Sequence, residues 1–172
     1  INSILQYGTN NLSEFDRDFR YSKLLTVIDA TDTSILSNDT KIRMVKEETP
    51  FSQSTNDFVL NYDNEIERGS FVSSLFTKTI NGVNFEAFLE DVNGTIQMCS
   101  RTRGSKEILI FNAGSIDYQN GLVNLTNFRL DGYFARGRSA FGDRVQFYAK
   151  NVNPDIIVDQ DQIILIQSLN IN

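Results

Sequence analysis

The chain has 172 residues, with 22 acidic and 16 basic side chains, one cysteine and no histidine, and its formal net charge is −6. This acidic balance argues against nucleic acid as a partner, because binding to phosphates requires a clustered positive field. No stretch of about 18 apolar residues occurs, so the sequence predicts no membrane span. A single cysteine excludes an intramolecular disulfide, and the lack of histidine excludes imidazole as a metal ligand or catalytic base.

The first 39 residues differ in pattern from the rest of the chain. Residues 1–12 are polar and show no periodicity, which predicts a linker. In residues 13–39 the apolar side chains recur at spacings of three and four, which predicts one or two helices. Ser13, with Asp16 three positions later, is typical of a helix N-cap. A short helical segment is therefore expected ahead of the remaining sequence.

From residue 40 onward the apolar period changes to two, which predicts antiparallel β-strands. Three Asn-Gly pairs lie between apolar runs, and each favours a two-residue type I′ turn because both turn positions need positive φ. The predicted strands are 41–46, 57–62, 71–80, 83–92, 95–103, 106–111, the two arms of a hairpin within 114–128, and 143–150.

The hairpin around Asn120-Gly121 allows a register to be written. A two-residue turn there places Tyr118 opposite Val123 and Ile116 opposite Leu125. These four apolar residues then share one face of the hairpin. The equivalent turns at Asn81-Gly82 and Asn93-Gly94 are expected to place Ile80 opposite Val83 and Leu89 opposite Met98.

The predicted fold class is α+β, predominantly antiparallel β, with a short helical N-terminal segment packed on β-hairpins and a meander. The predicted organisation is a linker at 1–12, a helical segment at 13–39 and an antiparallel β-rich domain at 40–172. Residues 13–172 are expected to form one compact unit, as suits a chain of this length.

No catalytic, cofactor-binding or metal site is predicted. The acidic pairs do not match the spacing of a calcium loop, so capping or solvent-facing roles are expected for them. Cys99 is expected to be a buried and unreactive thiol, because no histidine is available to activate it. A glycosidase needs only two carboxylates, and Glu86, Glu90 and Asp117 on predicted strands leave that alternative open, although a solvated sheet face explains the two glutamates more simply.

Two further side-chain groups suggest binding surfaces. Tyr133, Phe134 and Phe141 lie in one glycine-rich loop and are expected to cover the sheet or to form a protein interface, where large aromatic residues are common. An exposed aromatic platform for sugars is the alternative. The arginines near predicted turns are expected to be solvated or ion-paired, and they are Arg101, Arg103, Arg136 and Arg138.

Three stretches together resemble the C-terminal region of the baseplate wedge protein of T-even-type contractile-tailed bacteriophages. The first is Phe19-Arg-Tyr-Ser-Lys-Leu-Leu-Thr-Val-Ile-Asp-Ala-Thr-Asp-Thr-Ser-Ile-Leu-Ser-Asn38, followed directly by residues 41–45. The second is Gly114-Ser-Ile-Asp-Tyr-Gln-Asn-Gly-Leu-Val123. The third is Asn153-Pro-Asp-Ile-Ile157 followed by Asp161-Gln-Ile-Ile-Leu165. Their order and separation also match, so the resemblance covers about residues 15–166.

This resemblance implies a structural virion protein. The chain would be a C-terminal piece of a larger wedge subunit, consistent with its start at Ile1, located in the tail baseplate and assembled in the host cytoplasm. It would associate with itself, as an expected dimer, and with other baseplate wedge subunits in building the baseplate ring. The resemblance implies no catalysis, no cofactor, no metal, no nucleic acid and no membrane. The alternative function is a carbohydrate- or receptor-binding β-module of a viral or secreted protein, and an enzyme is the third.

Overall fold

The computed structural model describes residues 2–102, 105–133, 143–158 and 162–166. Its contacts divide the chain into two units, one made of residues 1–42 with 153–172 and the other of residues 43–152. Among the described residues, the first unit contains the helices α1 (Asn2–Asn11) and α2 (Tyr21–Asp29), and the second contains ten strands. No helix in the described part of the chain is long and apolar enough to cross a membrane.

Helix α1 occupies the residues for which the sequence predicted a linker, so that prediction is wrong for residues 2–11. The helix is polar over most of its length, but it buries Tyr7, whose ring packs edge-on against Phe19 with the ring centroids 6.4 Å apart. Leu12 and Leu24 complete the buried cluster of this unit. A short helix of this kind gains its stability from tertiary packing, which local periodicity does not report.

The predicted N-cap at Ser13 is also wrong. The Ser13 hydroxyl donates a hydrogen bond back to the carbonyl of Thr9, and the next helix begins only at Tyr21. Helix α2 ends at Asp29, and the Asp32 carboxylate then accepts a hydrogen bond of 2.8 Å from the Ser34 amide in the following turn. Within residues 13–39 the helical part is therefore shorter than predicted and begins only at Tyr21.

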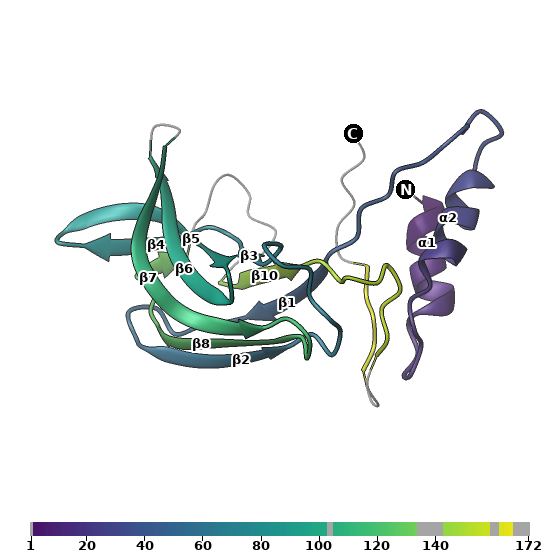
Figure 1. The fold of residues 1–172 in the computed structure, drawn as a ribbon. Helices are drawn as coiled ribbons and strands as arrows, with labels where there is room; N and C mark the ends of the chain where they lie inside the picture. Colours follow the sequence, from purple (N-terminus) through teal and green to yellow (C-terminus); the bar gives the residue numbers. More distant parts are fainter. Residues whose placement is uncertain (1, 103–104, 134–142, 159–161, 167–172) are drawn as a thin grey trace. The chain divides into compact units, whose positions relative to one another are not determined.

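The unit formed by residues 43–152 is an antiparallel sheet with the order β1-β10-β3-β5-β6-β7-β8-β2, in which β4 pairs with β5 and β9 (Figure 1). This confirms the predicted class, an α+β fold that is mostly antiparallel β. The strands are β1 (Met44–Glu48), β2 (Asn56–Asn61), β3 (Val72–Ser73), β4 (Phe76–Ile80), β5 (Val83–Val92), β6 (Thr95–Thr102), β7 (Ser105–Asp117), β8 (Leu122–Phe128), β9 (Gly132–Tyr133) and β10 (Val145–Ala149).

Two of the three Asn-Gly turns behave as predicted. Asn81 and Gly82 have φ of 51° and 78°, and Asn93 and Gly94 have φ of 51° and 88°, as both positions of a type I′ turn require. Ile80 lies opposite Val83, and Leu89 lies opposite Met98. The meander from β4 to β6 therefore has its predicted register.

The third turn differs. Ile116 lies opposite Val123, and Asp117 lies opposite Leu122, so the predicted register of this hairpin is wrong by two residues. The cause is local, because the Asp117 carboxylate accepts hydrogen bonds from the amides of Gln119 and Asn120 at 3.1 and 3.2 Å, which widens the loop to four residues. A shift of two leaves the side-chain faces unchanged. The four residues of the predicted apolar face are accordingly all buried, namely Ile116, Tyr118, Val123 and Leu125.

Gly121 is expected to be intolerant of a side chain. Its φ is 67°, and a Cβ atom there would lie 2.2 Å from the Asn64 carbonyl oxygen, whereas Gly69 has φ of 74° and open space around it. The Gly69→Ala variant should lose about 1 kcal/mol from left-handed backbone strain alone. Gly121→Ala should lose about 2 kcal/mol more, since the clash adds to the same strain. Urea unfolding followed by circular dichroism measures both, and equal losses would contradict the close approach.

Aromatic side chains form the centre of the core in the unit of residues 43–152. Phe128 is the hub, with its ring centroid 5.2 Å from that of Phe76 and 6.4 Å from that of Phe147. Phe147 in turn stacks on Phe71 at 6.2 Å. All four rings are at most 1% exposed, so the sheet closes around a dry aromatic centre.

Candidate interaction surfaces

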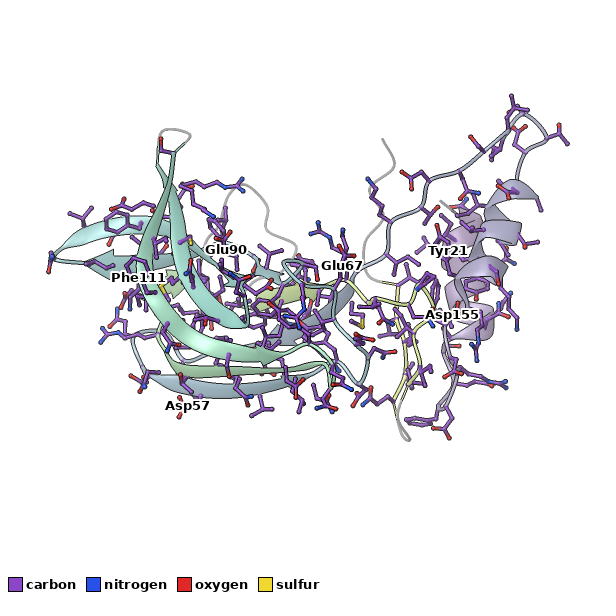
Figure 2. All side chains as sticks on the ribbon, viewed as in Figure 1. Tyr21, Asp57, Glu67, Glu90, Phe111 and Asp155 are labelled. Atoms are coloured by element: carbon purple, nitrogen blue, oxygen red, sulfur yellow. The ribbon has the colours of Figure 1, made fainter. Side chains whose placement is uncertain are left out.

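The start of α2 is held by a residue from the other end of the chain. The Tyr21 amide donates a hydrogen bond of 2.9 Å to Asp155 Oδ1, and Arg20 Nη1 donates one of 3.0 Å to Asp155 Oδ2. Figure 2 shows Asp155 beside the beginning of α2, where Tyr21 lies. A carboxylate in this position satisfies an amide that the helix leaves without an intrahelical partner.

The backbone beside Asp155 completes the same connection. Phe19 and Ile156 form an antiparallel bridge with N···O distances of 2.9 and 3.0 Å. The Asp18 carboxylate accepts a hydrogen bond from the Val158 amide at 3.3 Å and lies 2.9 Å from Arg20 Nη2. Residues 18–21 and 155–158 are thus tied into one motif. Residues 19–21 belong to the first stretch of the family resemblance, and residues 155–157 belong to the third.

The Asp155 carboxyl has a lowered pKa, chiefly because it accepts the hydrogen bond from the Tyr21 amide and also because it pairs with Arg20. A lowered pKa in the folded state means that this carboxylate stabilises the fold above the ordinary pKa of 3.8, and that the contribution is lost as the pH falls through the lower folded value. The Arg20→Gln variant should raise the Asp155 pKa toward 3.8. A carbon-13 NMR titration of the carboxyl group checks this, and an unchanged value would show that Arg20 contributes nothing.

A second hydrogen-bond network is centred on Asp91 of β5, which is 6% exposed. No pattern in the sequence indicated this residue. Its carboxyl oxygens accept hydrogen bonds from the amides of Gly69 and Phe71, both at 2.8 Å, and from the Tyr118 hydroxyl at 2.6 Å. The Tyr118 hydroxyl also accepts a hydrogen bond of 2.9 Å from the Gly94 amide. Burial, and then the hydrogen bond to Asp91, raise the pKa of Tyr118. This network connects the segment of residues 69–71, strand β5 with the turn after it, and the end of β7, and it stabilises the fold.

The three carboxylates considered for a glycosidase site lie in three different environments. Glu86 is exposed, Glu90 accepts a hydrogen bond of 2.7 Å from Lys106 Nζ, and Asp117 serves the turn before β8. Among the described residues no group of three or more acidic, cysteine or histidine side chains is placed to hold a metal. Asp159 and Asp161, one of the acidic pairs of the sequence, lie outside the described residues.

Cys99 is fully buried on β6, as predicted. Burial, and then the charge of Glu90, raise the pKa of its thiol to about 11. The thiol form therefore dominates at neutral pH, and thiolate chemistry is disfavoured.

The predicted aromatic surface is described only in part. Tyr133 lies half-buried in β9, and its hydroxyl donates a hydrogen bond to the carbonyl of Pro50, while Phe134 and Phe141 lie outside the described residues. The residue after Pro50 is Phe51, which is 79% exposed and was missed by the sequence analysis. Of the four arginines considered, Arg101 has its guanidinium carbon 5.4 Å from the centre of the Phe88 ring, and the other three lie outside the described residues.

A shallow hollow of about 420 Å³ lies beside the turn before β8. The guanidinium of Arg68 covers the Tyr118 ring there at 4.5 Å, and Asp117 at its margin is bonded within its own turn. The other residues that line the hollow are Gly94, Ile116 and Gln119.

The hairpin of β6 and β7 carries the most exposed aromatic side chain of the described strands. Phe111 on β7 is 70% exposed, and Ile108 on the same strand is 36% exposed. Figure 2 shows Phe111 on the outer side of the bend in β7, away from Glu90. Contiguous exposed apolar side chains mark contact surfaces, whereas scattered ones are ordinary on a protein surface.

Comparison with known proteins identifies the relatives of this chain. The family described as baseplate structural protein gp6, C-terminal domain III, matches residues 1–47. Baseplate wedge protein gp6 of Enterobacteria phage T4 is 32% identical over 111 residues, which are 63% of this chain and 17% of that protein. The chain therefore spans about a sixth of the length of the curated relative that it matches.

The family match ends at residue 47, close to residue 43, where the contacts place the beginning of the second unit. The resemblance inferred from the sequence is confirmed by both comparisons. The chain is related to the C-terminal region of the phage baseplate wedge protein.

Proposed function

We propose that this chain is the C-terminal part of a baseplate wedge subunit, and that it contributes to the baseplate ring by associating with itself and with other wedge subunits. The observation that carries the proposal is the relationship to the T4 wedge protein, at 32% identity over 111 residues. That relationship supports a structural role in the baseplate. Self-association and ring assembly are the part of the proposal that goes beyond it.

The surface of the described chain suits such a role. Large apolar side chains are exposed in both units, including Phe15 at 59% and Leu36 at 96% in one, and Phe51 and Phe111 in the other. A baseplate subunit would cover side chains of this kind against its neighbours, because large apolar and aromatic groups supply much of the energy of protein interfaces. The loop surface around Tyr133, Phe134 and Phe141 remains a predicted contact of this kind.

Light scattering coupled to size-exclusion chromatography, over a concentration series of the 172-residue chain, tests the proposal. A molar mass that rises above the 19.5 kDa of the monomer with concentration supports self-association. A monomer at every concentration would remove it from the proposed function of this chain. Saturable binding in a saccharide titration would instead favour the carbohydrate-binding alternative.

A further inference from the structure

The three Asn-Gly pairs of the β-sheet unit contain the groups of a spontaneous modification. The backbone nitrogen of the glycine can attack the side-chain carbonyl carbon of the preceding asparagine. The amide proton leaves with the side-chain nitrogen as ammonia, a cyclic succinimide forms, and water opens the ring to aspartate or isoaspartate. Glycine favours this attack because it has no Cβ atom to hinder its nitrogen. All three asparagines have this neighbour, so the surrounding structure decides their relative reactivity.

The attack requires the peptide between asparagine and glycine to rotate away from its folded conformation. At Asn81-Gly82 and Asn93-Gly94 that conformation is a type I′ turn with positive φ at both positions. At Asn120-Gly121 it is the wider loop before β8. Each turn must open locally before the nitrogen and the side-chain carbon meet, and the free energy of local opening differs widely within one protein. The turn with the fewest anchors is therefore expected to react first.

The turn at Asn93-Gly94 is anchored through both polar groups of its glycine. The Gly94 amide, whose nitrogen would attack, donates a hydrogen bond of 2.9 Å to the Tyr118 hydroxyl. The Gly94 carbonyl accepts one of 3.0 Å from the Ile116 amide. The Tyr118 hydroxyl is itself fixed, because it donates a hydrogen bond of 2.6 Å to Asp91. Opening this turn therefore breaks hydrogen bonds to a neighbouring strand, one of them at the reacting nitrogen.

The turn at Asn120-Gly121 is anchored at its side chain and at its glycine. Asp117 Oδ2 accepts a hydrogen bond of 2.7 Å from the Asn120 side-chain amide. The Gly121 carbonyl accepts one of 2.9 Å from the Tyr62 amide, and Gly121 is buried against the backbone of Asn64. Rotation of this peptide would break both hydrogen bonds and disturb the contact with Asn64. Asn120 is therefore protected as well.

The turn at Asn81-Gly82 lacks anchors of this kind among the described residues. Asn81 and Gly82 are both exposed, and nothing lies within 4 Å of the position that a Cβ atom on Gly82 would take. Val83, the next residue, is 55% exposed. The nearest described hydrogen bond to another part of the sheet is the one of 2.8 Å that the Thr79 amide donates to Asp131 Oδ2.

The strands beside this turn also have few neighbours. In the described part of the chain, β6 pairs with β5 only from Ala87 onward, and β9 pairs with β4 only at Phe76 and Thr77. The end of the β4–β5 hairpin is therefore a two-stranded ribbon, and Figure 1 shows it extending past the neighbouring strands. A hairpin of two strands is marginally stable on its own, so this end is expected to open more readily than the other two turns.

We propose that Asn81 is the site at which the folded chain deamidates spontaneously, and that the fold protects Asn93 and Asn120. Apart from the chain itself, the reaction consumes only water. Either product adds one negative charge to a chain whose formal charge is already −6. The isoaspartate product also adds a methylene group to the backbone between Ile80 and Val83, which a two-residue type I′ turn does not accommodate. The modification therefore alters the exposed end of the β4–β5 hairpin.

Peptide mapping by mass spectrometry, after incubation of the 172-residue chain at mildly alkaline pH, tests the proposal. In the folded chain Asn81 should convert about tenfold faster than Asn93 and Asn120, because their turns open more rarely. In a parallel sample unfolded in guanidinium chloride the three rates should become similar. Equal rates in the folded chain, a faster reaction at either of the other two sites, or no reaction at Asn81 while the unfolded chain reacts would overturn the proposal.

Two variants test the reason for the difference. Tyr118→Phe removes the acceptor of the Gly94 amide, so the rate at Asn93 relative to Asn81 should rise about threefold or more, the factor that one ordinary hydrogen bond provides. Asn81→Gly is the matched control, because Gly-Gly also suits a type I′ turn, and it should abolish the fast release of ammonia. An unchanged ratio in Tyr118→Phe, or undiminished ammonia release from Asn81→Gly, would overturn the proposal.

Discussion

Replacing Asp91 by alanine is expected to lower the free energy of unfolding by about 4 kcal/mol, one of the largest losses available in this chain. The carboxyl group is 6% exposed and accepts three hydrogen bonds, from the amides of Gly69 and Phe71 and from the Tyr118 hydroxyl. Alanine leaves all three donors without this acceptor, and each donor that is buried costs about 1–3 kcal/mol.

Two further variants make the Asp91 prediction specific. Tyr118→Phe removes one donor to Asp91 and the acceptor of the Gly94 amide, so it should lose about 1–2 kcal/mol. Glu86→Ala on the same strand removes an exposed carboxylate and should change stability by less than about 0.5 kcal/mol. Urea unfolding followed by circular dichroism gives all three values. A loss below about 1 kcal/mol for Asp91→Ala would show that these hydrogen bonds contribute little.

Phe128→Ala is expected to lose about 4 kcal/mol, by a different mechanism. The Phe128 ring contacts Phe58, Phe76 and Phe147, with centroid distances of 6.2, 5.2 and 6.4 Å. Alanine removes the apolar area buried by the ring and leaves a cavity among rings that belong to different strands, so the surroundings relax only in part.

Two control variants show whether the loss comes from the buried packing of Phe128 or from removing a phenylalanine ring at any position. Phe128→Leu fills most of the cavity and should lose about 1.5 kcal/mol. Phe111→Ala removes the same ring from a position that is 70% exposed, and it should change the free energy of unfolding by less than about 0.5 kcal/mol. Similar losses for the two alanine variants would contradict the assignment of Phe128 to the core. Differential scanning calorimetry provides an independent check of the ranking.

The sequence predicts the sheet well where the structure is decided by neighbouring residues. Asn81-Gly82 and Asn93-Gly94 determine both their turns and the strand pairs beside them, because positive φ at two successive positions is a strong local requirement. Asn120-Gly121 failed because Asp117 competes for the turn amides and Tyr118 is held by Asp91, which lies 27 residues away. Such a partner cannot be identified from the local sequence.

Helix positions were the least predictable. The N-cap expected at Ser13 was wrong, and the first amide of α2 is instead satisfied by Asp155, 134 residues further along the chain. Helix α1 lacks a continuous apolar stripe, and Tyr7 finds its partner in Phe19 only once the unit has folded. The exposure of Phe111 could not be predicted either. Phe111 is the most exposed aromatic residue on a described strand, and it lies in an irregular part of β7 that the apolar periodicity does not show.

The unit of residues 1–42 and 153–172 is discontinuous in sequence, because residues 43–152 of the other unit lie between its two segments. The bridge between Phe19 and Ile156 joins these two segments. During synthesis, residues 43–152 are complete before Asp155 and Ile156 have been translated, and domains generally fold as units in the order in which they emerge. The β-sheet unit can therefore form while α2 still lacks its carboxylate. The order of translation makes closure of the helical unit the later event, and a chain cut before residue 155 would contain every strand of the sheet while α2 lacks its partner.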